Sequence, residues 1–95
     1  MGADLRERWP HLDEFCRLAS DLKGLQVWLF GSAIGSVSPA DIDVLVVYSQ
    51  RSEVAALRTL HEWDQYDPPL HIIAMTDSEQ AFYNFIAFTH ADRLV

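Results

Sequence analysis

Basic residues are scarce in this sequence. Its 95 residues include seven Lys and Arg against fourteen Asp and Glu, which gives a formal charge of −7 at pH 7. A protein that neutralises nucleic-acid phosphates needs clustered Lys and Arg, and only Arg6 with Arg8, and Arg51 with Arg58, come close to clustering. We therefore expect no direct contact with nucleic acid, and an acidic surface that suits a basic partner.

Cysteine and long apolar runs are also scarce. The one cysteine, Cys16, cannot form an internal disulfide or supply a metal cluster, and its place in an apolar helical stripe predicts a small core residue. Apolar runs such as Val44–Val47 are far shorter than the roughly 18–20 residues of a membrane span. The segment Met1–Pro10 is charged, unlike a signal peptide. These features predict a soluble, cytoplasmic protein without a membrane partner.

The apolar content is sufficient for one core. Apolar residues make up 49% of the sequence, and it contains no internal repeat or Gly/Ser-rich linker. A domain usually contains ~100–200 residues. We therefore expect residues 1–95 to form a single domain, which leaves much surface unburied and open to a partner or a second copy.

The hydrophobic pattern predicts alternating helices and strands. The predicted elements are a helix over Pro10–Lys23, strands over Gln26–Phe30 and Ile42–Tyr48, a helix from Ser49–Ser52 to about Asp67, a strand over Leu70–Met75 and a last helix capped by Asp77 and Gln80. The first helix has an apolar stripe, the second has one shared face and the last has an inward face; these comprise, in turn, Leu12, Phe15, Cys16, Ala19 and Leu22, then Val54, Leu57, Leu60, His61 and Asp64, then Phe82, Phe85, Ile86 and Thr89. This order predicts an α/β domain with a three-stranded sheet flanked by helices.

Chemistry-bearing residues lie between the first two predicted strands. Gly31-Ser32 follows the first strand directly, where backbone N–H groups and a hydroxyl can face the oxygens of a triphosphate. Asp41 and Asp43 open the second strand two residues apart, so their side chains share one face and can converge on one cation. Carboxylates beside phosphate are typical ligands of Mg²⁺. The pattern therefore predicts a nucleotide–Mg²⁺ site, with Mn²⁺ as an alternative ion.

Gly-Ser, a short helix and loop, then Asp-x-Asp opening a strand form a specific combination. In this order the chain resembles the DNA polymerase beta-like nucleotidyltransferase superfamily, and most closely its minimal nucleotidyltransferases. The motifs match over about Val27 to Tyr48, and the rest of the chain matches by element order only. Gly31 and Ser32 would then bind the triphosphate, and Asp41 and Asp43 would be the catalytic and metal-binding residues. The implied reaction transfers a nucleoside monophosphate from a nucleoside triphosphate, with ATP as the expected donor, to a hydroxyl of a partner protein or a small molecule and releases pyrophosphate.

Two features depart from that family. About ten residues usually separate Gly-Ser from Asp-x-Asp, whereas Ala33 to Ala40 supplies eight. Active members also carry a third carboxylate on the next strand, where this sequence offers His71. We expect His71 to lie beside the nucleotide, although a hydrogen-bonded structural histidine is an equal alternative.

Three functions remain open. The chain is an active nucleotidyltransferase, a catalytically impaired relative that binds nucleotide and protein, or an assembly subunit with a vestigial motif. The resemblance also implies a protein partner that supplies the acceptor. Similar bacterial proteins are paired with helical proteins in toxin–antitoxin and phage-defence modules, where the nucleotidyltransferase modifies its partner. The retained Asp41 and Asp43 favour the enzyme over the assembly subunit, because paired carboxylates without a cation are costly. The shortened loop and the missing third carboxylate favour the impaired relative.

Overall fold

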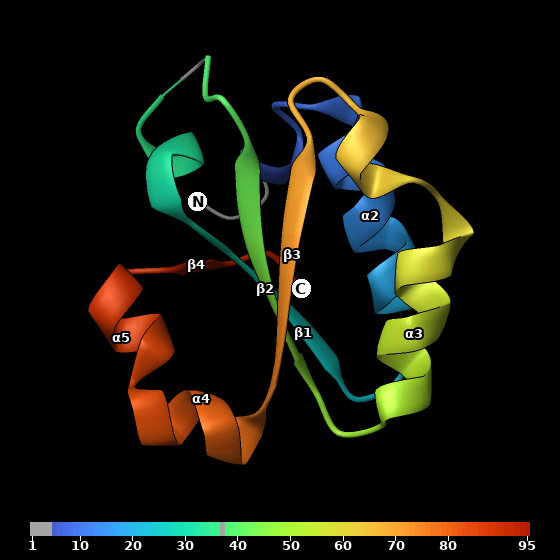
Figure 1. Ribbon diagram of the computed structural model, residues 1–95, viewed down its shortest axis with the longest axis vertical. Helices are drawn as coiled ribbons and strands as arrows, with labels where there is room; N and C mark the ends of the chain where they lie inside the picture. The colour runs from blue at the N-terminus through green and yellow to red at the C-terminus, as the bar shows by residue number, and fades with distance from the viewer. Residues whose placement is uncertain (1–4, 37) are drawn as a thin grey trace.

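The computed structural model describes residues 5–36 and 38–95. Residues 1–4 of the charged N-terminal segment, and Val37 in the predicted loop, lie outside the described residues. The elements, shown in Figure 1, are α2 (Pro10–Ser20), β1 (Leu25–Phe30), the 3₁₀ helix η1 (Gly31–Ile34), β2 (Ile42–Tyr48), α3 (Arg51–Leu60), the 3₁₀ helix η2 (Trp63–Gln65), β3 (Leu70–Thr76), α4 (Asp77–Tyr83), α5 (Phe85–Thr89) and β4 (Asp92–Arg93). Within the described ranges, none of the helices has the length and apolar character that a membrane crossing requires.

The sheet is mixed and has four strands in the order β3-β2-β1-β4. Strands β2 and β3 run parallel, whereas β1 is antiparallel to both β2 and β4. The α/β class is confirmed, but the prediction of three strands is wrong. Strand β4 contains only Asp92 and Arg93, which pair with Leu29 and Trp28. Two residues are too short to carry an alternating pattern, and so the sequence did not reveal this strand.

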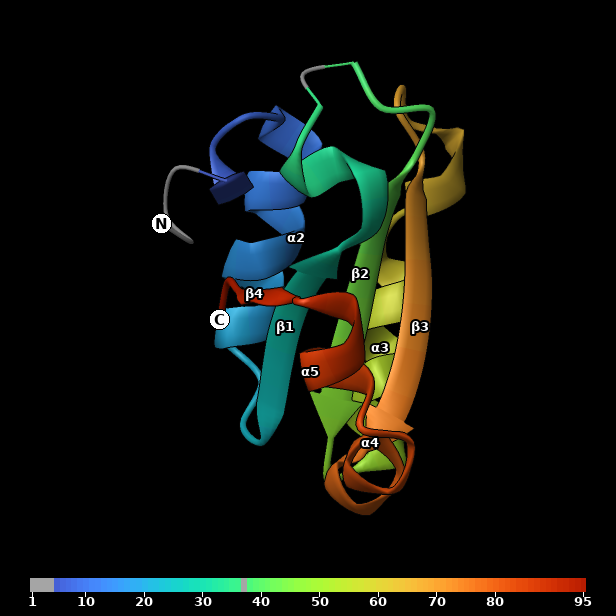
Figure 2. The same ribbon diagram turned by 90° about the vertical axis from the view of Figure 1, so that its left-hand side faces the viewer.

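Helices cover both faces of the sheet. Helices α2 and α3 lie on one face and α4 and α5 on the other (Figures 1 and 2). Four residues of the predicted stripe, Leu12, Phe15, Cys16 and Ala19, are fully buried. Helix α2 ends at Ser20, before the predicted end at Lys23, and Leu22 lies beyond it, partly buried. Strand β2 is buried along Val44–Val47, as a central strand covered on two sides should be.

Helix α3 ends earlier than the sequence predicted. Val54 and Leu57 are buried as expected, but Leu60 is half exposed, and His61 and Asp64 are exposed beyond the helix end. The backbone becomes extended at His61. The chain then turns back so that the Trp63 side chain is buried in the core. Its indole N–H donates a 2.9 Å hydrogen bond to the carbonyl oxygen of Leu57. An aromatic side chain from the next segment therefore covers the end of α3 and satisfies one of its last carbonyls.

The predicted last helix is two short helices. Thr76, rather than Asp77, caps α4: its hydroxyl accepts from the Glu79 N–H, and the Glu79 carboxylate accepts from the Thr76 N–H. Asn84 then adopts a left-handed conformation with φ 53°, which separates α4 from α5. The break leaves Phe82 exposed, so its predicted inward position is wrong. Phe85 instead packs edge-on against Phe30 of β1, with 5.0 Å between the ring centroids.

Candidate functional site

Strand pairing brings the predicted site residues to one end of the sheet. In the antiparallel pair β1–β2, Phe30 lies opposite Asp43, so Gly31 begins η1 next to that carboxylate. In the parallel pair β2–β3, Asp43 lies opposite His71. The Ile42 N–H also donates a 2.9 Å hydrogen bond to the carbonyl oxygen of Pro69, which aligns the starts of β2 and β3. Residues far apart in sequence therefore share one site because of strand register.

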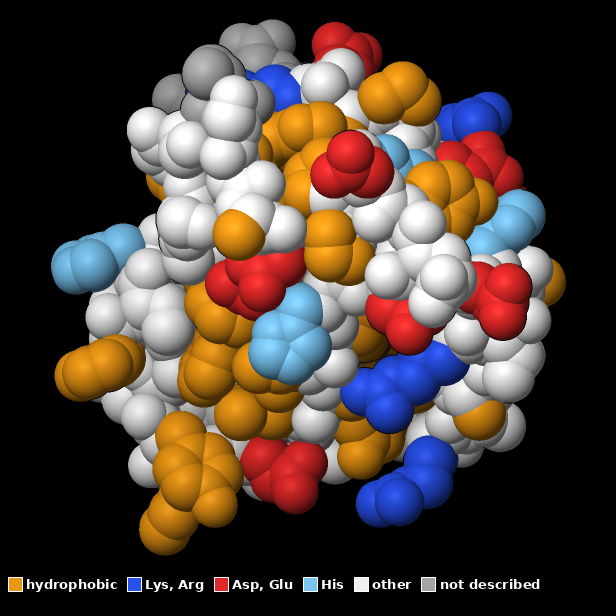
Figure 3. Space-filling model, turned by 45° about the horizontal axis from the view of Figure 1, so that its top comes forward, with side chains coloured by type: hydrophobic (Ala, Val, Ile, Leu, Met, Phe, Trp, Pro, Cys, Tyr) orange, Lys and Arg blue, Asp and Glu red, His pale blue; other side chains and the backbone are white. Residues whose placement is uncertain are grey.

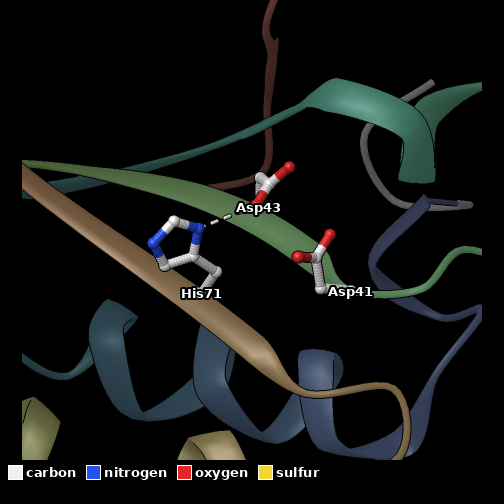
Figure 4. Close-up of side chains that lie close together, drawn as sticks. All are labelled: Asp41, Asp43 and His71. Carbon is white, nitrogen blue, oxygen red and sulfur yellow. Dashed lines mark hydrogen bonds and ion pairs between the residues drawn. The ribbon is translucent and has the colours of Figure 1, made fainter.

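Asp43 and His71 are directly hydrogen-bonded. The distance between His71 Nδ1 and Asp43 Oδ1 is 3.0 Å, and the histidine side chain is 62% exposed against 21% for the aspartate. A carboxylate only accepts, so Nδ1 carries the proton in this pair. Figure 4 shows the Nε2 side of the ring directed away from both carboxylates. The sequence alternative of a hydrogen-bonded histidine thus describes the geometry, without excluding a second role.

Asp41, Asp43 and His71 form a candidate cation site. Each offers one ligand atom, and these atoms lie within 4.8 Å of one another. Figure 4 shows all three side chains at the start of β2 and β3, on the same side of the sheet. Two carboxylates suit hard dications, and an imidazole adds a nitrogen ligand. The residues present therefore fit a divalent cation by their chemistry.

Gly31 allows the Asp43 carboxylate to approach the backbone. Gly31 has φ +80°, a conformation that residues with a side chain rarely adopt. A Cβ at this position would lie 2.5 Å from Asp43 Oδ2. Ser32 follows on η1 with an exposed side chain. The Gly-Ser motif and the Asp-x-Asp motif are therefore in contact through Gly31 and Asp43.

Arg8 contacts η1, and the sequence did not predict this contact. Its guanidinium Nη1 donates to the carbonyl oxygens of Ala33 and Ile34, at 3.4 and 3.3 Å. These bonds tie the segment before α2 to η1, the element that carries Gly31 and Ser32. More than twenty residues separate Arg8 from η1 in sequence, and no local sequence pattern predicts a contact over that distance.

The surroundings of the site are partly apolar. Figure 3 shows acidic and histidine side chains gathered on this end of the molecule beside a hydrophobic area. A shallow pocket of about 410 Å³ lies elsewhere, between α3, η2 and β3, and is lined by Arg58, Trp63, Leu70 and Ile72 among others. No predicted site residue lines that pocket. The candidate cation site therefore lies outside this pocket.

The fold and the site together define a small α/β domain with an Asp/Asp/His group at one end of a mixed sheet. Comparison with protein-family models, with curated proteins and with solved structures finds no match to this chain.

Proposed function

We propose that this protein is a minimal nucleotidyltransferase, which transfers a nucleoside monophosphate from a nucleoside triphosphate, preferably ATP, to a hydroxyl. The observation that carries the proposal is the contact between the two motifs. Gly31 and Asp43 meet at one point, with Asp41 and His71 beside them. A phosphate-facing turn and a carboxylate pair at one strand end are the parts that triphosphate chemistry requires.

Each residue has a stated role in this proposal. The backbone N–H groups of Gly31 and Ser32, with the Ser32 hydroxyl, bind phosphate oxygens. Asp41 and Asp43 hold Mg²⁺ or Mn²⁺, which neutralises phosphate charge when bound. The acceptor oxygen forms a bond to the α-phosphorus while the bond from that phosphorus to the α–β bridging oxygen breaks. Pyrophosphate leaves with that oxygen, and the hydroxyl proton passes to water. A cytoplasmic location, where ATP is available, is part of this proposal.

A partner protein supplies the acceptor hydroxyl in this proposal. Helices α4 and α5 present Phe82 and Phe88 with exposures of 82% and 81%, together with the exposed Tyr83. Exposed aromatic groups are enriched where proteins associate. The net charge of −7 favours a basic partner. A helical partner in a toxin–antitoxin or defence module fits this description, with the present chain as the modifying subunit.

One observation favours a second function. His71 lies opposite Asp43, at the position where the resembled family carries a third carboxylate. A nucleotide-binding subunit that has lost catalysis would retain Gly31, Asp41 and Asp43 and tolerate histidine there. An assembly subunit with a vestigial motif would need neither nucleotide nor cation.

A transfer assay tests these functions. The protein, alone and with any co-purifying partner, is incubated with α-labelled ATP and Mg²⁺ or Mn²⁺, and both chains are analysed by mass spectrometry. We expect a gain of one nucleoside monophosphate that Asp41→Asn combined with Asp43→Asn abolishes while the fold remains. The matched control is Asp64→Asn, an exposed aspartate outside the site. Nucleotide binding without transfer would support the second function, and transfer by the double mutant would refute the site.

A further inference from the structure

His71 Nδ1 and Asp43 Oδ1 lie close enough to bind the same cation. Ligand atoms in neighbouring octahedral positions, each about 2.1 Å from the metal, lie about 3.0 Å apart. The observed distance from Nδ1 to Oδ1 is 3.0 Å. A cation that binds both atoms would take the place of the proton in their hydrogen bond and would lie to one side of the line that joins them.

The third ligand atom is within reach of the same centre. The ligand atoms of Asp41, Asp43 and His71 lie within 4.8 Å of one another, and opposite ligands of an octahedron lie about 4.2 Å apart. A small rotation of an aspartate side chain closes this difference. The His71 side chain is 62% exposed, so no packing prevents approach of an ion.

A nitrogen ligand changes which ion such a site prefers. Mg²⁺ prefers oxygen ligands and gives up water reluctantly, whereas first-row transition-metal dications accept imidazole nitrogen readily. The combination of two carboxylates and one imidazole therefore suits Mn²⁺ better than Mg²⁺.

We propose that His71 Nδ1 is a direct ligand of the cation held by Asp41 and Asp43, and that the site consequently binds Mn²⁺ more tightly than Mg²⁺. This inference rests on the proposed function for the presence of a cation, and it specifies which ion the site selects. His71 would thus supply a nitrogen ligand at the position where the third carboxylate of the resembled family would supply an oxygen ligand.

The test measures cation binding by the full chain without nucleotide. Mn²⁺ is titrated and followed by electron paramagnetic resonance, pulsed measurements detect coupling to a bound nitrogen, and Mg²⁺ is added as competitor. We expect nitrogen coupling and at least about tenfold tighter binding of Mn²⁺ than of Mg²⁺. His71→Ala should remove the coupling and weaken Mn²⁺ binding about 10- to 100-fold. His71→Asp should remove the coupling and bring the two affinities closer together. His61→Ala, which changes an exposed histidine outside the site, is the matched control, and circular dichroism checks the fold of each variant.

Three results would overturn the inference: bound Mn²⁺ without nitrogen coupling, coupling that survives in His71→Ala, or equal affinities for Mn²⁺ and Mg²⁺. A histidine that only orients Asp43 through a hydrogen bond would also weaken binding when removed, but it would give no coupling. Nucleotide is absent from this experiment, so its outcome is independent of transfer. Nitrogen coupling in a protein that transfers nothing would refute the proposed function and support the His71 ligand.

Discussion

The carboxylate of Asp43 occupies the space that a side chain on residue 31 would need. Asp43 Oδ2 lies 2.5 Å from the position of a Cβ built on Gly31, and Gly31 has φ +80°. Two independent constraints, backbone conformation and close approach, therefore require glycine here. The orientation of the Asp43 carboxylate depends on a residue that has no side chain of its own.

Gly31→Ala should damage both stability and the site. A left-handed conformation costs a residue with a side chain about 1–2 kcal/mol, and the added methyl group must displace the Asp43 carboxylate. We expect the free energy of unfolding to fall by at least about 1 kcal/mol and cation affinity to fall with it. Chemical denaturation and cation titration measure the two effects.

Gly35→Ala is the matched control for Gly31→Ala. Gly35 has φ −105°, and a Cβ there meets nothing within 4 Å. We expect stability to change by less than about 0.5 kcal/mol and cation affinity to stay the same. Equal effects of the two substitutions would contradict the role assigned to Gly31.

Phe82 and Phe85 should respond differently to truncation. Phe85 is partly buried and packs edge-on against Phe30, whereas Phe82 is 82% exposed. Phe85→Ala should lower the free energy of unfolding by about 2 kcal/mol, roughly half the loss for a fully buried phenylalanine. Phe82→Ala should change it by less than about 0.5 kcal/mol. Thermal and denaturant unfolding of both variants measure these losses. A large loss of stability in Phe82→Ala would show that Phe82 packs inward, as the sequence pattern predicted, and would contradict its exposed position.

Thr76→Ala should destabilise α4. The substitution removes the hydroxyl that accepts from the Glu79 N–H, and loss of such a cap costs about 1 kcal/mol. Thr59→Ala in α3 is the control, because the Thr59 hydroxyl only donates to a carbonyl oxygen of its own helix, that of Ala56. Alanine is the better helix former at that position, so stability should stay the same or rise slightly. Hydrogen exchange of the α4 amides would localise the loss, and unchanged exchange in Thr76→Ala would refute the cap.

Cys16 should be unreactive until the protein unfolds. Burial raises the pKa of the Cys16 thiol from 9.0 to about 12, and the side chain is fully buried. We expect no reaction with a thiol-specific reagent at pH 8 in buffer and full reaction in denaturant. The unfolded chain loses the thiol proton above about pH 9 while the folded chain keeps it, so this group lowers stability as pH rises from 9 towards 12. Fast labelling of the folded protein at pH 8 would contradict the buried position.

Long, regular segments were predictable from sequence, whereas chain reversals were not. Strand β2 has the predicted bounds, because its continuous apolar run predicts a buried central strand. The end of α3 was misplaced since Leu60 and His61 continue the helical spacing, and only the tertiary position of Trp63 shows that the chain has turned. The break at Asn84 was missed for a similar reason, because the apolar spacing continues across it.

The candidate site was predictable in its residues but not in its contacts. The sequence placed Asp41 and Asp43 on one face, and the motif order suggested that Gly31 lies nearby. The hydrogen bond between Asp43 and His71 depends on the parallel register of β2 and β3, which no local pattern specifies. The bonds from Arg8 to η1 likewise require the complete fold.

The strand order gives the sheet two unequal edges. Strand β3 contributes seven residues to one edge, whereas the two-residue strand β4 protects the other, with further backbone bonds from Leu94 and Val95 to Val27. A long open edge invites strand addition by a second molecule, and a short one resists it. Two copies that join through β3 would each have used their one long edge, so such an assembly would stop at a pair and would not extend into a fibre.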